Sequence, residues 1–396
     1  MRARLPSSPF VLLDDARTSG AARPARLYAE PVEVVQADSI EEVVPALERL
    51  RAARKAGLHA AGTLSYEAGL ALEPRLRGIH RRRAENDPPL LWFGLFAEVR
   101  EVAQDAVPAL FPQTDGYSLP AVSPMISRAD YERAFARVRE AILGGDIYQA
   151  NLTFPCMVDV GADPAALYGL IRHRAAAGHC ALLFTGQHWL LSFSPEQFFA
   201  LEGNRLITRP MKGTALRALD PAQDAANAAA LRTDPKQRAE NLMIVDLLRN
   251  DLSRVAQPGS VTVPELFTIE SYPTVHQMTS AVTACLRDGL DAVDVLAALF
   301  PCGSITGAPK IRAMEIIHET EAYPRGPYTG AIGAIEPLGN AAFNVAIRTI
   351  CVEKGAKEGV IGLGSGLVAD SEAESEWREC LDKSLFLGAI PEGLRK

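Results

Sequence analysis

The chain has 396 residues, of which 48% are hydrophobic and 22% are charged, with a formal net charge of −7. This composition indicates a folded globular protein with room for one large domain or two to three smaller ones, and the lack of a basic cluster argues against nucleic-acid binding. No two of its six cysteines are closer than seventeen residues, and no apolar run is long enough for a membrane span. We therefore expect a cytoplasmic protein with reduced thiols and no membrane segment.

The first hundred residues predict a mixture of helix and strand. Residues 39–57 predict a helix, because Ser39 and Glu42 can form a capping box and Gly57 can end the last turn. The apolar run LLWFGLFAEV predicts a strand. Residues 102–127 carry four prolines and no periodic pattern, so we place a connector there. It would join an N-terminal part, residues 1–115, to a second part, residues 125–392.

The second part opens with a predicted helix at residues 127–146, which stops at a pair of glycines. Strands are then predicted at residues 147–160, 181–186, 189–209, 327–337, 342–353 and 359–368, with helices between several of them. Hairpin spacing early and mixed helices later favour an α+β sandwich over regular alternation of parallel strands and helices.

Two predicted helices carry carboxylates that could bind a metal ion. The run RAENLMIVDLLRND places Glu240 outside the predicted apolar stripe, which comprises Leu242, Met243, Leu247 and Leu248. Near the C-terminus, Glu376 and Glu379 are three residues apart and share one side of a helix. Carboxylate oxygens of this kind suit Mg²⁺. The alternative is a solvated acidic face with an ion pair between Glu379 and Lys383, and spacing alone favours this alternative.

Glycine-rich runs form a second group of candidates. The stretch PCGSITGAPK places Pro309 in the first turn of a helix, whose free N–H groups could receive an anion. It is not a phosphate-binding P-loop, because no glycine precedes Lys310 and no Ser or Thr follows it. The run GLGSGLVADS would let a ligand approach the backbone, although a bulged strand would look the same. Arg348 lies inside a predicted apolar strand and needs a buried partner, such as a substrate carboxylate.

A lysine and a glutamate form the last candidate pair. Lys212 lies in PMKGT, and Glu196 lies sixteen residues earlier in FSPEQFF. The segment between them predicts a hairpin turning at Glu202, Gly203 and Asn204, which would let both side chains face one cavity. They are then a plausible nucleophile and acid, or else an ordinary cross-strand ion pair.

The motifs FSPE, PMKGT, RAENLMIVDLLRND, GSITGAPK, YTGAIG, IRT, GLGSGLVADS and ESEWRE occur in the order found in the chorismate-utilising enzymes. The chain resembles this family over about residues 125–390, and more loosely through SYEAG near the N-terminus. The resemblance implies a layered β/α/α/β sandwich whose two sheets enclose helices, with the chorismate site inside. It also implies Mg²⁺ as cofactor, bound by Glu240, Glu376 and Glu379 and holding the ring carboxylate of chorismate.

The same resemblance implies roles for residues around the substrate. The group that fixes the enolpyruvyl carboxylate would be Tyr328, Arg348, Gly364 and Gly366. Thr306 and Thr214 would supply hydroxyls on the substrate side. His276 matches a histidine near the ring, although a structural core histidine is nearly as good an interpretation.

Two positions distinguish members of the family. Water-activating members carry a lysine where this chain has Gln149, and anthranilate-forming members read Pro-Ile-Ala-Gly-Thr where this chain has Lys212 in PMKGT. The resemblance therefore implies amination of chorismate at C4 by ammonia, with Lys212 attacking C2 and Glu196 protonating the departing 4-hydroxyl. The product, 4-amino-4-deoxychorismate, would serve the p-aminobenzoate branch of folate synthesis.

Alternatives stay open at this point. Anthranilate formation, with loss of pyruvate, is the nearest. A non-catalytic anion-binding or nucleotide-binding module built on GSITGAPK is a rival of another class. No glutamine-hydrolysing pattern is visible, so ammonia would come from a separate glutaminase subunit or from solution. The sequence departs from the family at Gln237, where an acidic residue is common, and at Cys302, where glycine is common. These departures leave one outer carboxylate and the shape of one loop in doubt.

Overall fold

The computed structural model describes residues 4–18, 22–79, 81, 83–84, 86–113, 117–271 and 275–388. The expected limits at residues 115 and 392 lie outside these ranges. Within the ranges the α-helices are α1 (Ile40–Lys55), α2 (Ala68–Leu72), α3 (Arg128–Leu143), α4 (Pro164–Ala175), α5 (Pro221–Thr233), α6 (Pro235–Ser253), α7 (Ala292–Leu299), α8 (Lys310–Thr320) and α9 (Ala373–Asp382). Short 3₁₀ helices are η1 (Arg77–Ile79), η2 (Val107–Leu110) and η3 (Gly303–Ile305).

Over the described residues the strands form two antiparallel sheets of ten strands each. Sheet A runs in the order β16 (Gly307–Ala308), β8 (Gln149–Asp159), β20 (Glu358–Leu367), β19 (Thr349–Glu353), β10 (His188–Ser194), β9 (His179–Phe184), β1 (Phe10–Asp14), β2 (Ala25–Ala29) and β6 (Arg100–Val102), with β7 (Val122–Pro124) also on β8. Sheet B runs β13 (Met211–Leu216), β15 (Val275–Cys285), β12 (Arg205–Thr208), β11 (Gln197–Glu202), β18 (Ala341–Val345), β17 (Ala331–Ile335), β4 (His59–Leu64), β5 (Leu91–Phe96) and β3 (Glu33–Ala37), with β14 (Thr262–Ser271) also on β15.

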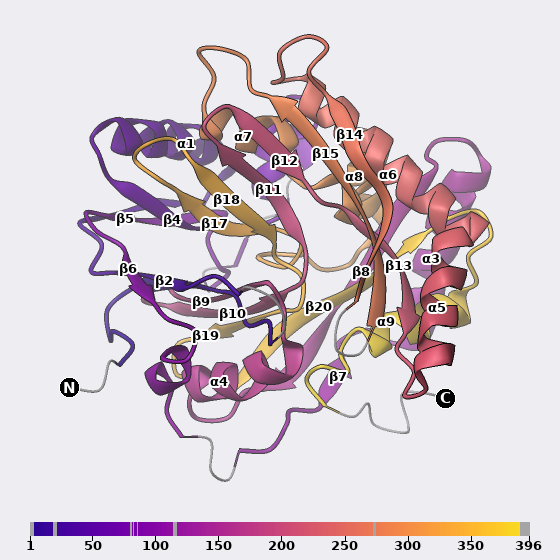
Figure 1. Cartoon of the computed structure of the whole chain (residues 1–396), viewed down its shortest axis with the longest axis horizontal. Coiled ribbons are helices and arrows are strands. Elements are labelled where there is room, and N and C mark those ends of the chain that lie inside the picture. Colours follow the sequence, from indigo (N-terminus) through magenta and orange to yellow (C-terminus); the bar gives the residue numbers. More distant parts are fainter. Residues whose placement is uncertain are drawn as a thin grey trace.

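The two sheets pack directly on each other, and helices cover their outer faces (Figure 1). One apolar cluster joins the sheets and includes Val11, Leu183 and Leu190 of sheet A with Trp92 and Ile332 of sheet B. Two further clusters lie on the outer faces, under α1, α6 and α7 on sheet B and under α3, α4 and α9 on sheet A. The expected two-sheet α+β sandwich is thus confirmed. The expected β/α/α/β order of layers is wrong, because strands that are apolar on both faces pack a sheet on one side and helices on the other.

The N-terminal residues complete both sheets. Strand β1 pairs with β9 in sheet A, and β4 pairs with β17 in sheet B. Helix α1 has the predicted capping box between Ser39 and Glu42, and Gly57 follows it with φ +84°. None of the helices in the described ranges has the length and apolarity that crossing a bilayer requires.

The chain crosses between the sheets at two neighbouring points. Residues 189–209 leave sheet A after β10 and enter sheet B at β11, and residues 342–353 return from β18 in sheet B to β19 in sheet A. At these crossings the N–H of Val345 donates to Glu196 O over 3.1 Å, and the N–H of Phe193 donates to Arg348 O over 3.1 Å. The expectation that Arg348 lies inside a strand is therefore wrong. It lies in the crossing with φ +52°, a left-handed conformation that is uncommon outside glycine.

Candidate active site

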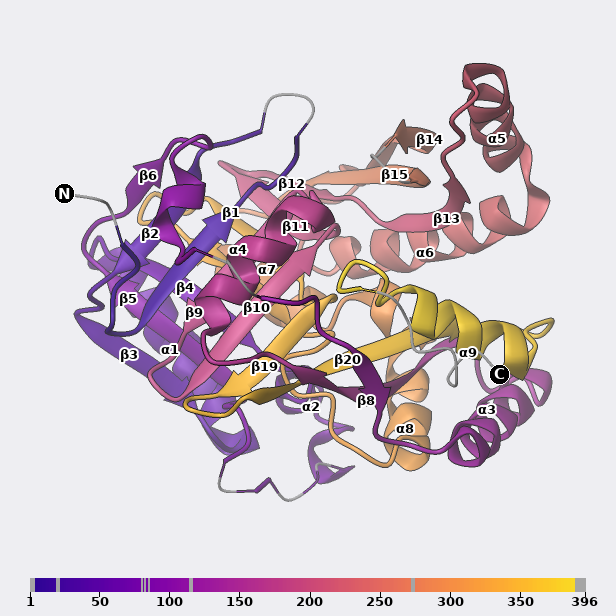
Figure 2. The same ribbon diagram turned by 90° about the horizontal axis from the view of Figure 1, so that it is seen from below.

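Lys212 reaches from sheet B toward sheet A. It lies on β13, and Figure 2 shows β13 and α6 on one side facing β20 and α9 on the other. A Cβ atom added to Gly366 of β20 would lie 3.5 Å from Nζ of Lys212 and 2.8 Å from Nε2 of Gln149. Because Gly366 has no side chain, the lysine and the glutamine can both lie close to the backbone of β20. The structure therefore brings Lys212, Gln149 and Gly366 together.

The surroundings of Lys212 favour its uncharged amine. Burial lowers the pKa of Lys212, and the positive charge of Lys383 lowers it further, against the opposing effect of Glu196, Glu240 and Glu379. A lysine with a lowered pKa has a larger fraction of free amine at neutral pH, which is the form that acts as a nucleophile.

Glu196 lies at the crossing between β10 and β11, where it is 6% exposed. Burial raises its pKa, while the hydrogen bond from Ser304 and the charges of Lys212 and Lys383 work against that rise. Ser304 Oγ donates to Glu196 Oε1 over 2.7 Å. A carboxyl group that keeps its proton to higher pH suits general acid catalysis. Ser304 belongs to the GSITGAPK motif, but nothing in the sequence pattern indicates its contact with the acid.

Replacing Ser304 with alanine is expected to shift the pH profile of the reaction. The hydrogen bond from Ser304 favours the charged carboxylate, so its loss should raise the pKa of Glu196 further. If Glu196 acts as an acid, kcat/KM falls as pH rises past that pKa, and this fall should move to higher pH in the variant. A pH profile of kcat/KM for wild type and Ser304→Ala measures the shift; a movement toward lower pH contradicts the assignment.

Three glutamates line the gap between α6 and α9. Burial raises the pKa of Glu240, which Lys212 and Lys236 oppose and Glu379 and Glu376 reinforce. Glu376 accepts a hydrogen bond from Ser371 Oγ at 2.7 Å, and Glu379 forms the expected ion pair with Lys383 at 2.8 Å. Within the described ranges, no three His, Cys, Asp or Glu side chains are grouped closely enough to hold a metal ion. The three carboxylates interact electrostatically in this conformation without converging on one point.

Lys383 is a residue that sequence reasoning treated only as a partner of Glu379. Its Nζ also donates to Gly364 O over 2.8 Å, so it joins α9 to the glycine-rich part of β20. The spacing of four residues from Glu379 indicates the ion pair. The contact with β20 depends on how α9 packs on the sheet, which the spacing does not show.

The predicted substrate-binding residues lie on several different segments of the chain. The ring of Tyr328 packs over Gly362, where an added Cβ would lie 2.0 Å from Cδ1. Thr306 is fully buried, and its hydroxyl is 3.2 Å from both Cys302 O and Gly303 O. Gly364 faces Thr153, since an added Cβ would lie 2.6 Å from that side chain. Because these glycines of β20 have no Cβ, Tyr328 and Thr153 can lie directly against the backbone of the strand.

Arg348 is directed toward the segment after α9. Its guanidinium carbon lies 5.7 Å from the ring centre of Phe386, a cation–π distance. The partner that sequence reasoning expected for it, a substrate carboxylate, stays a prediction.

His276 and Thr214 lie on opposite faces of sheet B. His276 is opposite Ala215 in the register of β13 and β15, and neighbouring residues of a strand point to opposite faces. The Nε2 atom of His276 lies 3.0 Å from Asp224 Oδ1 of α5, and Nδ1 lies 2.9 Å from Ser271 Oγ of β14. Both ring nitrogens therefore have protein partners, as in a structural core histidine. Thr214 is exposed and donates to Gln277 Oε1 over 3.0 Å.

The two departures from the family pattern are accommodated locally. Cys302 has φ −57°, so this position does not need a glycine, and its sulfur lies 3.3 Å from Ser304 Oγ. Gln237 packs against Gly213, where an added Cβ would lie 2.9 Å from the amide oxygen.

Lys310, in the GSITGAPK motif, donates to Asp251 at 2.6 Å and to Leu299 O at 2.8 Å. Its ammonium is used inside the protein, which argues against a role in nucleotide binding.

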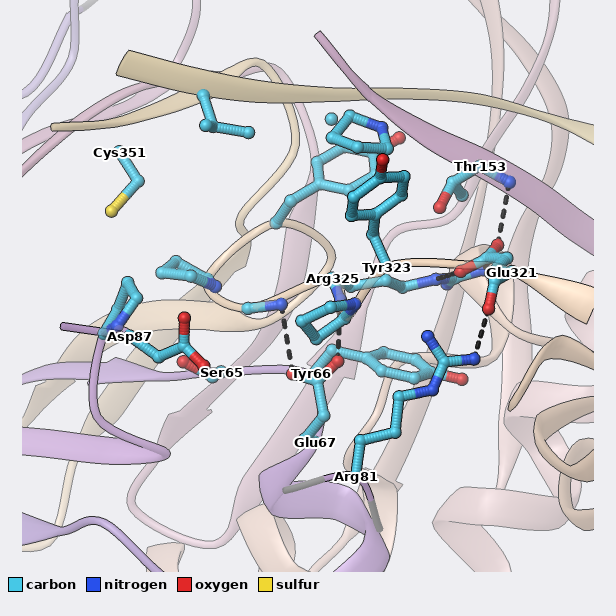
Figure 3. Close-up of a pocket in the computed structure, with 18 of the residues that line it drawn as sticks. Ser65, Tyr66, Glu67, Arg81, Asp87, Thr153, Glu321, Tyr323, Arg325 and Cys351 are labelled. Carbon is cyan, nitrogen blue, oxygen red and sulfur yellow. Dashed lines mark hydrogen bonds and ion pairs between the residues drawn. The ribbon is translucent and has the colours of Figure 1, made fainter. Parts of the chain in front are cut away.

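A cavity of about 1040 Å³ lies beside this group of residues. Of the predicted site residues only Tyr328 lines it. Figure 3 shows another part of its wall, where hydrogen bonds join Arg325 to Glu67 and Glu321. The guanidinium carbon of Arg325 lies 4.5 Å from the ring centre of Tyr66. Sequence reasoning reached this wall only through the loose match at SYEAG.

Comparison with known proteins gives one family. The family described as chorismate binding enzyme matches residues 8–387. Aminodeoxychorismate synthase component 1 of Klebsiella aerogenes is 44% identical over 258 residues, which cover 65% of this chain and 57% of that protein. Anthranilate synthase component 1 of Haloferax volcanii is 36% identical over 314 residues, 79% of this chain and 59% of that protein. The chain thus spans little more than half the length of these relatives.

Solved structures share the fold. Anthranilate synthase component I of Streptococcus pneumoniae superposes with a TM-score of 0.79 at 24% identity, covering 93% of each chain. The menaquinone-specific isochorismate synthase of Escherichia coli superposes with a TM-score of 0.73 at 16% identity, covering 98% of this chain and 90% of the other. At such identities the likeness establishes the architecture, and chemistry has to be argued from the site.

Proposed function

The chain belongs to the family of chorismate binding enzymes, and from this we propose that it aminates chorismate at C4 with ammonia to give 4-amino-4-deoxychorismate. The observation that carries the proposal is Lys212, a lysine with a lowered pKa that lies against Gly366 and interacts with Glu196. The 44% identity to aminodeoxychorismate synthase component 1 of Klebsiella aerogenes supports the same reaction.

The proposed chemistry uses the two groups at the centre of the site. The neutral amine of Lys212 adds to C2 of chorismate, the ring double bonds shift, and the 4-hydroxyl leaves as water with the proton of Glu196. Ammonia then adds at C4, the double bonds shift back, and the lysine is released at C2. The raised pKa of Glu196 and the lowered pKa of Lys212 give each group the protonation state that its step needs.

Recognition of the substrate would use the residues around Lys212 and Glu196. Tyr328, Arg348 and the glycines of β20 would receive the enolpyruvyl carboxylate, and Thr306 would contact the ring. Gln149 stands where a lysine would activate water, and its amide is a poor base, so water is disfavoured as the nucleophile.

Mg²⁺ is the proposed cofactor. Glu240, Glu376 and Glu379 would supply hard oxygen ligands. Burial raises the pKa of Glu240, and the negative charges of Glu379 and Glu376 add to that rise, so a bound cation would stabilise its carboxylate form. When bound, the metal would neutralise the ring carboxylate of chorismate.

Removal of divalent cations is expected to abolish turnover. With EDTA, chorismate consumption should fall to background, and added Mg²⁺ should restore it, because the three carboxylates would otherwise repel an anionic substrate. Glu240→Gln should raise the Mg²⁺ concentration needed for half-maximal rate. Full activity in EDTA would exclude the proposed cofactor.

The product profile tests the function. Wild-type protein with chorismate, Mg²⁺ and ammonium should accumulate 4-amino-4-deoxychorismate, detected by mass spectrometry and by conversion to p-aminobenzoate on adding a lyase. Accumulation of fluorescent anthranilate with release of pyruvate would contradict the proposal and favour the anthranilate-forming alternative.

The relatives are named as components, which supports a second polypeptide that supplies ammonia. We place a glutamine-hydrolysing subunit in this role, with free ammonium as its substitute in the assay. The product would feed p-aminobenzoate and folate synthesis.

A further inference from the structure

Arg325 is buried at the junction of three segments of the site. It is 8% exposed, and its guanidinium uses every one of its N–H groups. Nε and Nη2 bind the carboxylate of Glu321 at 2.9 and 2.7 Å. Nη1 donates to Ile305 O at 2.9 Å and to Thr329 Oγ1 at 3.5 Å, and Nη2 also donates to Asn151 O at 2.6 Å.

The partners of Arg325 extend this junction. Glu321 Oε1 accepts the N–H of Thr153 at 2.8 Å, so the same carboxylate holds both the arginine and strand β8. Glu67 accepts the N–H groups of Arg325 and Gly326 at 2.7 and 3.0 Å, which fixes the backbone at the start of the turn. Figure 3 shows Glu67, Glu321 and Arg325 side by side in the cavity wall.

Each segment that the guanidinium contacts carries a residue of the proposed substrate site. Ile305 precedes Thr306, Thr329 follows Tyr328, and Asn151 is two residues from Gln149 on β8. The N–H of Asn151 also donates to Thr306 O at 2.8 Å. These segments come from distant parts of the sequence, and a planar guanidinium fixes the directions of its donors as well as their distances.

We propose that Arg325, held by Glu321, is a positioning residue that sets the spacing of Thr306, Tyr328 and Gln149 around the substrate. This rests on the proposed function, since those three residues are assigned to chorismate by it. A displacement of about 1 Å in such residues reduces kcat/KM by roughly 10²-fold, even when the altered side chain is not at the reacting atoms. Arg325 itself lines the neighbouring cavity and would act on the substrate site through the backbone that it holds.

A matched arginine provides the control. Arg172 forms a buried two-bond pair with Asp14, at 2.6 and 2.9 Å, and also contacts Gln104. This pair lies between α4 and β1, on the outer face of sheet A. Arg172→Lys therefore weakens a comparable buried ion pair and leaves the three site segments unchanged.

The test compares Arg325→Lys with Arg172→Lys in steady-state kinetics and thermal unfolding. Both variants keep the positive charge and lose the planar guanidinium that binds a carboxylate through two hydrogen bonds, so both should unfold at a lower temperature. Arg325→Lys should lower kcat/KM for chorismate by roughly 10²-fold, mainly through KM, with the KM for ammonium unchanged. Arg172→Lys should keep wild-type kinetics. Equal kinetic losses in the two variants, or a loss confined to the KM for ammonium, would overturn the proposal.

Two measures keep this test decisive. If Arg325→Lys does not fold, Glu321→Gln replaces it, because the amide keeps the shape and one acceptor while it removes the charge and the second bond to Arg325. A loss of chorismate affinity is expected here too, and wild-type KM would overturn the proposal. The assay follows chorismate consumption as well as product: a different wild-type product refutes the proposed amination, whereas amination with an unaltered KM in Arg325→Lys refutes the positioning role alone.

Discussion

Lys212→Ala is expected to reduce formation of 4-amino-4-deoxychorismate by at least about 10³-fold at saturating ammonium, because the alanine offers no nucleophile for C2. Binding of Mg²⁺ and the unfolding temperature should stay near wild type, since alanine removes an amine whose charged form is disfavoured by burial. Rates come from chorismate consumption and product analysis. In the absence of ammonium, wild type should also accumulate an adduct on Lys212 with the mass of chorismate less water.

Lys310→Met is the matched control for this variant. It removes another inward-facing ammonium, which pairs with Asp251 away from the proposed nucleophile. The variant is expected to lose stability and keep most of its turnover per folded molecule. Retention of the full rate by Lys212→Ala would show that the covalent step is dispensable, and a missing adduct in wild type would leave the lysine only an electrostatic role.

Glu196→Gln should reduce kcat by about 10²- to 10⁴-fold with little change in the KM for chorismate. The amide keeps the size of the side chain and can still accept the hydrogen bond from Ser304, but it cannot donate the proton that the departing hydroxyl needs. Turnover at a series of pH values measures the loss. The fall of activity toward high pH that wild type shows should disappear in the variant.

Glu196→Asp is the companion variant. It keeps an acid but shortens the side chain, so it should retain part of the rate and a pH-dependent profile. If Glu196→Gln has wild-type kcat, another group protonates the leaving oxygen, and Glu196 acts on Lys212 only through its charge.

Much of the local structure followed from the sequence. The capping box at Ser39 and the glycine that ends α1 act over a few residues, and the structure has both. The predicted hairpin between Glu196 and Lys212 is also present, with Gly203 at φ +61° in its turn. Such features depend on nearest neighbours along the chain, so a local pattern is enough to specify them.

Helix α6 shows where a local pattern was insufficient. The predicted stripe included Leu242, which is 44% exposed, whereas Ile244, Val245 and Leu252 are buried. In an apolar run several helical faces are nearly equivalent, and the face that turns inward is chosen by the sheet and helices against which it packs. The expected position of Glu240 outside the stripe did not depend on this choice.

The active site also has some features that the sequence shows and others that only the tertiary structure decides. The residue types at two positions, Lys212 in PMKGT and Gln149 on β8, indicate from the sequence alone which nucleophile to expect. The crossing of the chain between the sheets at Glu196 and Arg348, the contact of Ser304 with the acid, and the junction at Arg325 join segments that are up to 258 residues apart. Such contacts arise only when two sheets pack, because their partners are fixed by the distance between layers and by strand register rather than by spacing along the chain.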